Sequence, residues 1–254
     1  MFRFRGKRLS FVAIAVRLRR LLARPGSSRY CLCCGRGSGR FLSAGDYAYN
    51  KRSDAKCPWC GSLERHRLLL HYLRSNRGAW TSRKTVLHFA PEIYLEGVFR
   101  SNPNWVYLTS DLHYRSMVKA DLTNLSFPSN RFDLIICSHT LDHVPDDLKA
   151  MSEIFRVLKP GGLAIFQCLV DPESPLTRSG PPTGAPRREK GGECIRVYGT
   201  DLQDRLQSAG FAVEIREQGN YITGDRLVRW GLSAKDNPVL LRQNDLYLCR
   251  KIPR

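Results

Sequence analysis

Short apolar runs separated by polar turns organise the second half of the chain. The clearest block begins with the apolar run 132–137, which is typical of a strand buried on both faces of a parallel sheet. Across residues 147–158 the apolar positions recur at three- and four-residue steps, which predicts a helix whose shared face carries Leu148, Met151, Phe155 and Leu158. A turn at 159–162 and a second apolar run at 163–170 complete a strand–helix–strand unit of a parallel sheet.

Five further apolar segments are predicted strands: 85–89, 105–109, 118–120, 211–217 and 245–251. A helix is expected from Glu64 through Leu73, ahead of the first of these strands. Polar side chains, including Ser138 and His139, follow strand 132–137 directly. Because ligands bind beyond the carboxyl ends of strands in open α/β sheets, these polar residues mark the expected site.

The segment 156–162, with the letters RVLKPGG, follows a fitting helix and a strand that opens with Phe-Asp. This block resembles class I S-adenosylmethionine-dependent methyltransferases of the type 11 group, and the resemblance extends from about Thr85 to the C-terminus. It implies an α/β, doubly wound, mostly parallel seven-stranded sheet of Rossmann-like type. The cofactor S-adenosylmethionine follows from the resemblance alone.

The turn after the first predicted strand departs from that family. Methyltransferases normally place a glycine-rich turn there, but this chain has Phe89, Ala90, Pro91 and Glu92. Since Pro91 fixes φ and lacks an N–H, the turn cannot bind cofactor in the ordinary way. Relatives that carry the same cysteine motifs tend to have a similar turn. Glu92 is expected either to meet the ammonium group of the cofactor or to cap the next helix.

The resemblance assigns further cofactor contacts at the following strand ends. Asp111, with Leu112 beside it, is expected to accept hydrogen bonds from both ribose hydroxyls, a task that suits a carboxylate. Asp121 would hold the adenine amino group, and Leu122 would offer its backbone N–H.

The same resemblance puts Ser138 and His139 under the reactive sulfonium. His139 and His143 are the candidate catalytic residues, because a histidine there could position the acceptor or remove its proton. The alternative is that they are helix-start residues bonded to the backbone.

Nine cysteines occur, and four of them form two C-x-x-C-Gly motifs that 22 residues separate. This spacing predicts a zinc ribbon in which Cys31, Cys34, Cys57 and Cys60 hold a tetrahedral Zn²⁺. Four thiolates indicate a structural ion, and persistent thiolates indicate a reducing compartment, hence a cytoplasmic location. Whether Cys33 joins the site stays open.

The second cysteine motif continues into a segment similar to the CPxCGSxERHR segment of bacterial methyltransferases that carry such a ribbon. Its basic cluster, Arg65, His66 and Arg67, is expected to hold the ribbon against the main domain or to bind an anionic acceptor. A second segment also resembles these relatives, in which a similar motif precedes the next helix. Its residues here are Arg196, Tyr198, Gly199 and Asp201.

The net charge of +18 is concentrated at one end of the chain. Residues 1–85 hold 20 Lys/Arg against three Asp/Glu, and the remainder holds 21 against 20. The positive electrostatic field of this part favours RNA, DNA or anionic lipid as a partner, although a solvated basic surface without a specific partner explains the charge equally well.

Residues 1–29 contain no acidic residue, and their pattern predicts a basic amphipathic helix. This helix is expected to dock on the main domain, to lie on an anionic membrane, or to serve as an organellar transit peptide in a eukaryote. No apolar run reaches the ~20 residues of a membrane span.

These features predict three parts: a basic segment 1–29, a ribbon with its linking helix 30–84, and a methyltransferase domain 85–254. Within the last, loop 171–192 is a candidate lid and insertion 219–243 a candidate acceptor wall. The expected function is methyl transfer to an O or N nucleophile of a small molecule or glycan. The alternatives are an RNA methyltransferase that grips RNA with its basic half, and a non-catalytic binding module suggested by the altered first turn.

Overall fold

The computed structural model describes residues 26, 28–45, 52–113, 115–180, 194–217, 222, 224–232 and 245–253. Its centre is a seven-stranded sheet in which β13 alone runs antiparallel to its neighbours. The strands lie side by side in the order β12 (Ala212–Arg216), β13 (Leu246–Arg250), β9 (Leu158–Gln167), β8 (Phe132–Ser138), β5 (Lys84–Phe89), β6 (Trp105–Asp111) and β7 (Val118–Lys119). The predicted mostly parallel seven-stranded sheet is confirmed.

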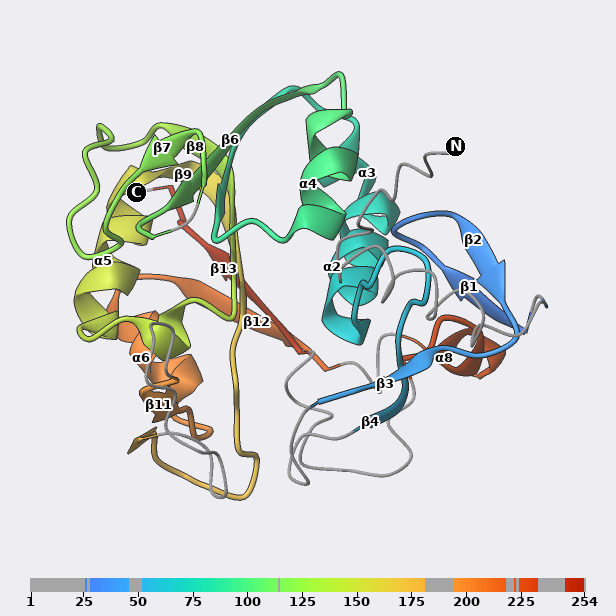
Figure 1. Ribbon diagram of the computed structural model, residues 1–254. Coiled ribbons are helices and arrows are strands. Elements are labelled where there is room, and N and C mark those ends of the chain that lie inside the picture. The colour runs from blue at the N-terminus through green and yellow to red at the C-terminus, as the bar shows by residue number, and fades with distance from the viewer. Residues whose placement is uncertain are drawn as a thin grey trace, which may run out of the picture.

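Helices cover both faces of this sheet, as Figure 1 shows. One face carries α5 (Asp147–Val157) and α6 (Leu202–Ser208), and the other carries α2 (Glu64–Ser75), α3 (Arg77–Trp80) and α4 (Ile93–Arg100). A short 3₁₀ helix, η1 (Leu141–His143), follows β8, and the hairpin β10 (Arg178–Ser179) with β11 (Arg196–Val197) follows β9.

The central strands are buried on both sides because their side chains alternate between two apolar cores. In β5, Leu87 and Phe89 pack with α5 and α6, whereas Val86 packs with α2, α3 and α4. In β8, Ile135 points to the first core and Ile136 to the second. This two-residue period explains why both strands read as continuous apolar runs in the sequence.

Helix α5 begins where the sequence predicts, but its buried face is different. The side chain of Asp146 accepts a hydrogen bond from the Lys149 N–H at 3.0 Å and so caps the helix. The prediction that Leu148 lies on the buried face is wrong, since Leu148 is 43% exposed. The residues that pack on the sheet are Ala150, Met151, Ile154 and Val157, and Leu148 lies beside this stripe.

The cysteine-rich region forms two small antiparallel hairpins, β1 (Arg29–Cys31) with β2 (Arg36–Ser38) and β3 (Leu42–Ala44) with β4 (Arg52–Lys56). Helix α8 (Asp225–Arg229), from the predicted insertion, lies against this ribbon in Figure 1. The insertion and the ribbon are therefore neighbours, although nearly 170 residues separate them in the sequence.

The contact between them depends on Arg67, whose side chain is fully buried. Its guanidinium donates at 2.6–2.7 Å to four backbone carbonyls, those of Ala55, Ser62, Trp230 and Gly231. It also lies over the Phe41 ring, 4.6 Å from the ring centroid. The structural role expected for the basic cluster thus holds for Arg67.

Several predicted features fall outside the described residues. These are nearly all of the basic helix (1–25 and 27), residues 181–192 of the candidate lid, and much of the candidate acceptor wall (219–221, 223 and 233–243). Within the part of the chain that is described, no helix has the length and apolar content needed to cross a bilayer.

Candidate functional site

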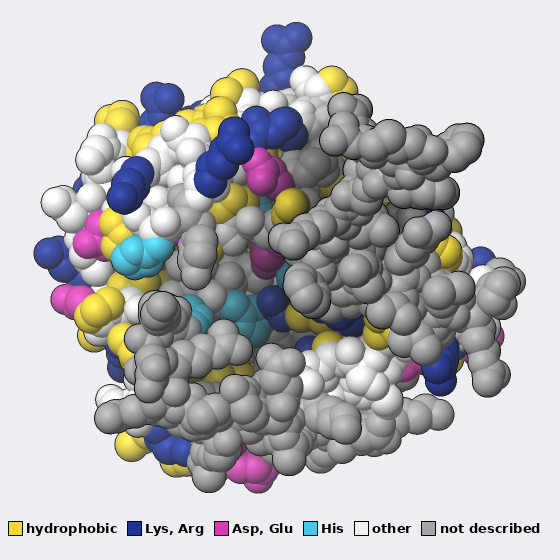
Figure 2. All heavy atoms as spheres, viewed as in Figure 1, with side chains coloured by type: hydrophobic (Ala, Val, Ile, Leu, Met, Phe, Trp, Pro, Cys, Tyr) yellow, Lys and Arg dark blue, Asp and Glu magenta, His cyan; other side chains and the backbone are white. Residues whose placement is uncertain are grey.

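A cavity of about 850 Å³ lies at the carboxyl ends of β5, β6 and β8. It is where the polar residues after these strands meet, and its volume is in the range typical of cofactor sites. Figure 2 shows the face of the molecule that is turned to the viewer in Figure 1. Acidic, basic and histidine side chains gather in a hollow near the centre of this face.

Most of the predicted cofactor and catalytic residues line this cavity. Its walls include Ala90, Pro91, Glu92, Asp111, Leu112, Asp121, Leu122, His139 and His143. Of the predicted set, Phe89 and Ser138 are not among the lining residues: Phe89 is buried in the core, and the Ser138 hydroxyl donates to Gln167 Oε1 at 3.2 Å.

Eight other residues line the cavity that the sequence analysis did not predict as site residues: Ser110, His113, Arg115, Thr123, Thr140, Val144, Pro145 and Asp146. Ser110, His113, Arg115, Thr123 and Thr140 lie in or close to a strand end, which is the signal that could have found them, whereas Val144, Pro145 and Asp146 lie beyond η1.

The turn after β5 holds a left-handed residue without using glycine. Ala90 has φ of +45°, a conformation that disfavours a side chain, and its N–H donates to the Ser110 carbonyl at 2.9 Å. Together with Pro91, which has no N–H, this leaves the turn with little donor capacity toward a ligand.

Glu92 stands at the start of α4, yet its side chain makes no capping bond to the described residues. Its carboxylate lies 3.0 Å from His88 Nε2 and 3.5 Å from His66 Nε2. Burial alone would raise the pKa of Glu92, but the His88 hydrogen bond and the charge of Arg65 contribute to lowering it below its usual value. Burial and the charge of Arg65 lower the pKa of His66 to about 3. Glu92 is therefore a carboxylate held at the cavity wall by its neighbours.

Two more carboxylates stand at neighbouring strand ends. Asp111 ends β6, and its Oδ1 accepts the His113 N–H at 2.7 Å. Asp121 follows β7, and its Oδ1 accepts the N–H and hydroxyl of Thr123 at 2.8 and 2.9 Å. In β6, directly before Asp111, the buried Ser110 Oγ has no hydrogen-bond partner among the described residues. Acceptor carboxylates around an unsatisfied hydroxyl fit the polar groups of a nucleoside cofactor.

His139 is held in a strained conformation at the end of β8. Its φ is +47°, and its N–H donates to the Gln167 carbonyl at 2.7 Å. Its Nδ1 lies 3.6 Å from Asp142 Oδ2. Burial raises the pKa of Asp142 to about 7, against the Leu169 N–H and the charges of Arg196 and Arg65, which lower it.

Residues of the motif at 196–201 form hydrogen bonds that hold the loop carrying His143. Arg196 donates to the carbonyls of Leu141, Val144 and Pro145. The Tyr198 hydroxyl donates to the Asp147 carboxylate at 3.0 Å. Arg196 and Tyr198 therefore hold residues 141–147 in place, and part of this stretch lines the cavity.

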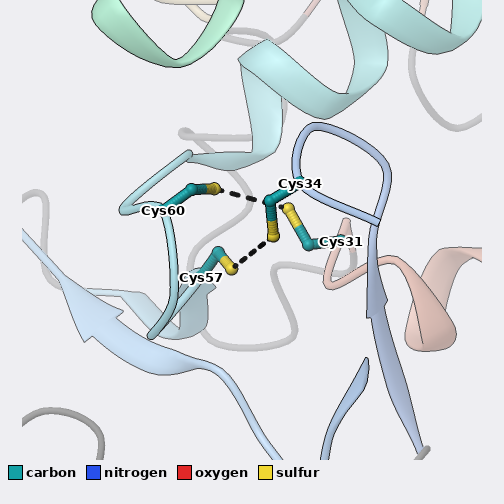
Figure 3. Close-up of side chains that lie close together, drawn as sticks. All are labelled: Cys31, Cys34, Cys57 and Cys60. Atoms are coloured by element: carbon teal, nitrogen blue, oxygen red, sulfur yellow. Dashed lines mark hydrogen bonds between the residues drawn. The ribbon is translucent and has the colours of Figure 1, made fainter. Parts of the chain in front are cut away.

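The predicted zinc ligands converge, as Figure 3 shows. The four Sγ atoms of Cys31, Cys34, Cys57 and Cys60 lie within 4.8 Å of one another. The Cys31–Cys60 and Cys34–Cys57 sulfur pairs are 3.7 and 3.8 Å apart. A tetrahedron with Zn–S bonds of about 2.3 Å has edges of about 3.8 Å, so the set fits Zn²⁺.

The turns of the two cysteine motifs explain this convergence. Gly35 and Gly61 have φ of +68° and +84°, and their N–H groups close turns onto the carbonyls of Cys31 and Cys57. Cys33 is not part of the metal-ligand group found among the described residues.

Known proteins resemble parts of this chain. Residues 101–166 match the type 11 family described as "Methyltransferase domain". A demethylmenaquinone methyltransferase of Staphylococcus saprophyticus is 38% identical over 68 residues, which are 27% of this chain and 29% of that protein. The cycloartenol-C-24-methyltransferase of Arabidopsis thaliana is 34% identical over 106 residues, 39% of this chain and 30% of that protein. The chain thus spans under a third of the length of these curated relatives.

The fold has solved counterparts as well. The 1,6-didemethyltoxoflavin-N1-methyltransferase of Burkholderia thailandensis, solved with its substrate and S-adenosylhomocysteine, superposes with a TM-score of 0.51 at 14% identity, covering 74% of this chain and 79% of that one. At this identity the likeness concerns the fold. The chain therefore has the class I methyltransferase fold, with a central segment that matches the type 11 methyltransferase domain.

Proposed function

We propose that this protein is an S-adenosylmethionine-dependent methyltransferase. The observation that carries the proposal is the cavity at the carboxyl ends of β5, β6 and β8, where Asp111 and Asp121 stand at neighbouring strand ends. S-adenosylmethionine, when bound there, supplies a methyl group already activated by positive sulfur. The chain's own task is then alignment and exclusion of water.

The lining residues divide between cofactor and acceptor. Asp111 would accept hydrogen bonds from the ribose hydroxyls, and Asp121 with Leu122 would hold the adenine. His139 stands on the opposite wall, with Nδ1 toward Asp142. Its other nitrogen, Nε2, would take the proton of an acceptor that must lose one, and Asp142 would orient the ring for this role.

A small molecule is the acceptor class we favour. The three relatives named above carry the names of small-molecule methyltransferases: for a quinone, a sterol and a toxoflavin precursor. Residues of η1 and of the loop that Arg196 holds line one side of the cavity, and we propose that the acceptor binds on this side.

The cysteine group is proposed to hold a structural Zn²⁺. Its four thiolates leave no open position for water, which a catalytic zinc would need. The test is metal analysis of the purified chain: one zinc per chain is expected, and Cys57→Ser is expected to lose zinc and stability together. A Cys137→Ser variant, outside the group, should keep its zinc.

RNA is the second candidate acceptor, because of the charge distribution. Residues 1–85 carry 20 Lys/Arg against three Asp/Glu, and several arginines of this part are exposed: Arg36, Arg40, Arg74, Arg77 and Arg83. Binding through these would track phosphates and weaken with salt.

One experiment separates these functions. Zinc-loaded protein and methyl-labelled S-adenosylmethionine are added to a cell extract, with and without ribonuclease, beside an Asp111→Asn variant. Label in the small-molecule or glycan fraction that resists ribonuclease and is lost in the variant supports the proposal. Ribonuclease-sensitive label supports RNA, and absence of label in every fraction, despite cofactor binding, indicates a binding module.

A further inference from the structure

Arg65 is not one of the residues that line the cavity, but its backbone and its neighbour His66 contact the cavity wall. Its neighbour His66 faces the Glu92 carboxylate at 3.5 Å. On the other side, the Arg65 carbonyl accepts a hydrogen bond from Gln167 Nε2 at 3.4 Å, and the Gln167 carbonyl accepts the N–H of His139. The first turn of α2, which directly follows the cysteine group, is thereby placed against the wall formed by the 90–92 turn and His139.

The charge of Arg65 is not neutralised by a direct partner. It interacts with the charges of Glu92, Glu64 and Asp142, yet within the described ranges it forms no ion pair closer than 4.0 Å. Its Nε is shielded from solvent and has no hydrogen-bond partner there either. Arg65 is only partly buried, and a guanidinium whose shielded Nε has no bond is able to bind an anion.

The nearby carboxylates are already engaged. Glu92 is bonded to His88 and faces His66, while Asp142 accepts the Leu169 N–H at 3.2 Å and faces His139. Neither needs Arg65 for its hydrogen bonds. Arg65 therefore has donors to spare for a ligand.

The turn that would otherwise receive an anion is poor in donors. Pro91 has no N–H, and the Ala90 N–H is used by the Ser110 carbonyl. A glycine-rich turn would present several N–H groups at this place, and this chain presents fewer. An arginine beside the turn supplies a stronger donor set for a carboxylate, because a guanidinium can bind both of its oxygens.

From this geometry we infer that Arg65 binds the α-carboxylate of the cofactor's methionine end, in place of the backbone donors that the 90–92 turn lacks. The inference rests on the proposed function and deepens it. It makes the ribbon side of the molecule part of the cofactor site, because Arg65 follows Cys60 by only five residues.

The test compares two nucleosides by titration calorimetry on the zinc-loaded full chain. S-adenosylhomocysteine carries the carboxylate, and its decarboxylated analogue, which keeps the amine, does not. The wild-type protein is expected to bind S-adenosylhomocysteine at least about tenfold more tightly than the analogue. Arg65→Gln is expected to remove this preference by weakening S-adenosylhomocysteine alone, while the analogue binds within about twofold of wild type.

Two further variants complete the test. Arg65→Lys keeps the charge without the paired donors and should give an intermediate preference, and Arg77→Gln, an exposed control on α3, should change neither affinity. Equal loss of both nucleosides in Arg65→Gln, or an unchanged preference, would overturn the inference. If the wild-type protein binds neither nucleoside, the proposed function itself is contradicted, and this inference with it.

Discussion

Replacing Asp142 by asparagine removes a buried carboxylate whose ionisation opposes folding. Asp142 is 2% exposed, and burial raises its pKa to about 7. An unfolded aspartate has a pKa of about 3.9. Because the folded state holds the proton more tightly than the unfolded state, this group makes the protein less stable as the pH rises from about 4 to about 7.

The size of the effect follows from the difference between the two pKa values. Three pKa units correspond to about 4 kcal/mol in total, of which about 2–3 kcal/mol falls between about pH 5 and about pH 8. Asparagine keeps the shape and one acceptor oxygen but has no charge to bury. The stability of Asp142→Asn relative to wild type should therefore increase by about 2–3 kcal/mol across that interval.

Urea unfolding of both proteins at several pH values measures this difference, and groups common to both cancel. Asp146→Asn is the matched control, because asparagine caps a helix about as well as aspartate and Asp146 is exposed. Its difference from wild type should stay small and constant with pH. A difference for Asp142→Asn that is equally independent of pH would refute the reasoning, since burial would then not control the ionisation of this carboxylate.

Three further predictions concern stability, each measured by urea unfolding. Arg67→Met leaves four backbone carbonyls without their donor and should cost at least about 3 kcal/mol; a loss under about 1 kcal/mol would mean that Arg67 does not join the ribbon to α8. Gly231→Ala should lower the free energy of unfolding by about 2 kcal/mol or more, because φ is +57° and an added Cβ would lie 2.4 Å from the Phe41 ring. Gly97→Ala is the control: its added Cβ meets nothing within 4 Å, so this substitution should be neutral or stabilising. Ala90→Gly should stabilise the protein by up to about 1 kcal/mol by relieving a φ of +45°, and a clear loss of stability would contradict a strained turn.

The strands were predictable from the sequence because their burial leaves a local mark. In β5 and β8 the side chains alternate between two cores, so a short, continuous apolar run reports a central strand directly. The cap at Asp146 and the two cysteine turns are equally local, since each depends on residues a few positions apart. The buried face of helix α5 was harder to predict. Leu148 fits the apolar spacing, but the packing of the helix on the sheet decides which stripe is buried.

Polar partners that are distant in sequence were not predictable. Nothing near Arg67 indicates that it bonds the carbonyls of Trp230 and Gly231, more than 160 residues away. Glu92 was expected to cap α4 or to meet the cofactor, and its bond to His88 and contact with His66 emerge only when β5 and α2 pack together. The burial of Asp142 likewise depends on the loop that follows β9.

The candidate site lies between these two cases. Strand ends are local features, so the sequence located Asp111, Asp121 and His139, and the fold brings them around one cavity. The cofactor contact that we infer for Arg65 was not predicted from the sequence, because Arg65 lies on a helix before the first strand of the sheet. Its sequence neighbours suggested only a basic cluster.

The most direct test of the account is equilibrium binding of S-adenosylhomocysteine to the zinc-loaded chain, with Asp111→Asn beside it. We expect one site per chain, and we expect the variant to weaken binding by about tenfold or more, because a hydroxyl bonded to a carboxylate contributes about 1.5–3 kcal/mol. Folded, metal-loaded protein without affinity for this nucleoside, or with the same affinity in the variant, would contradict the account.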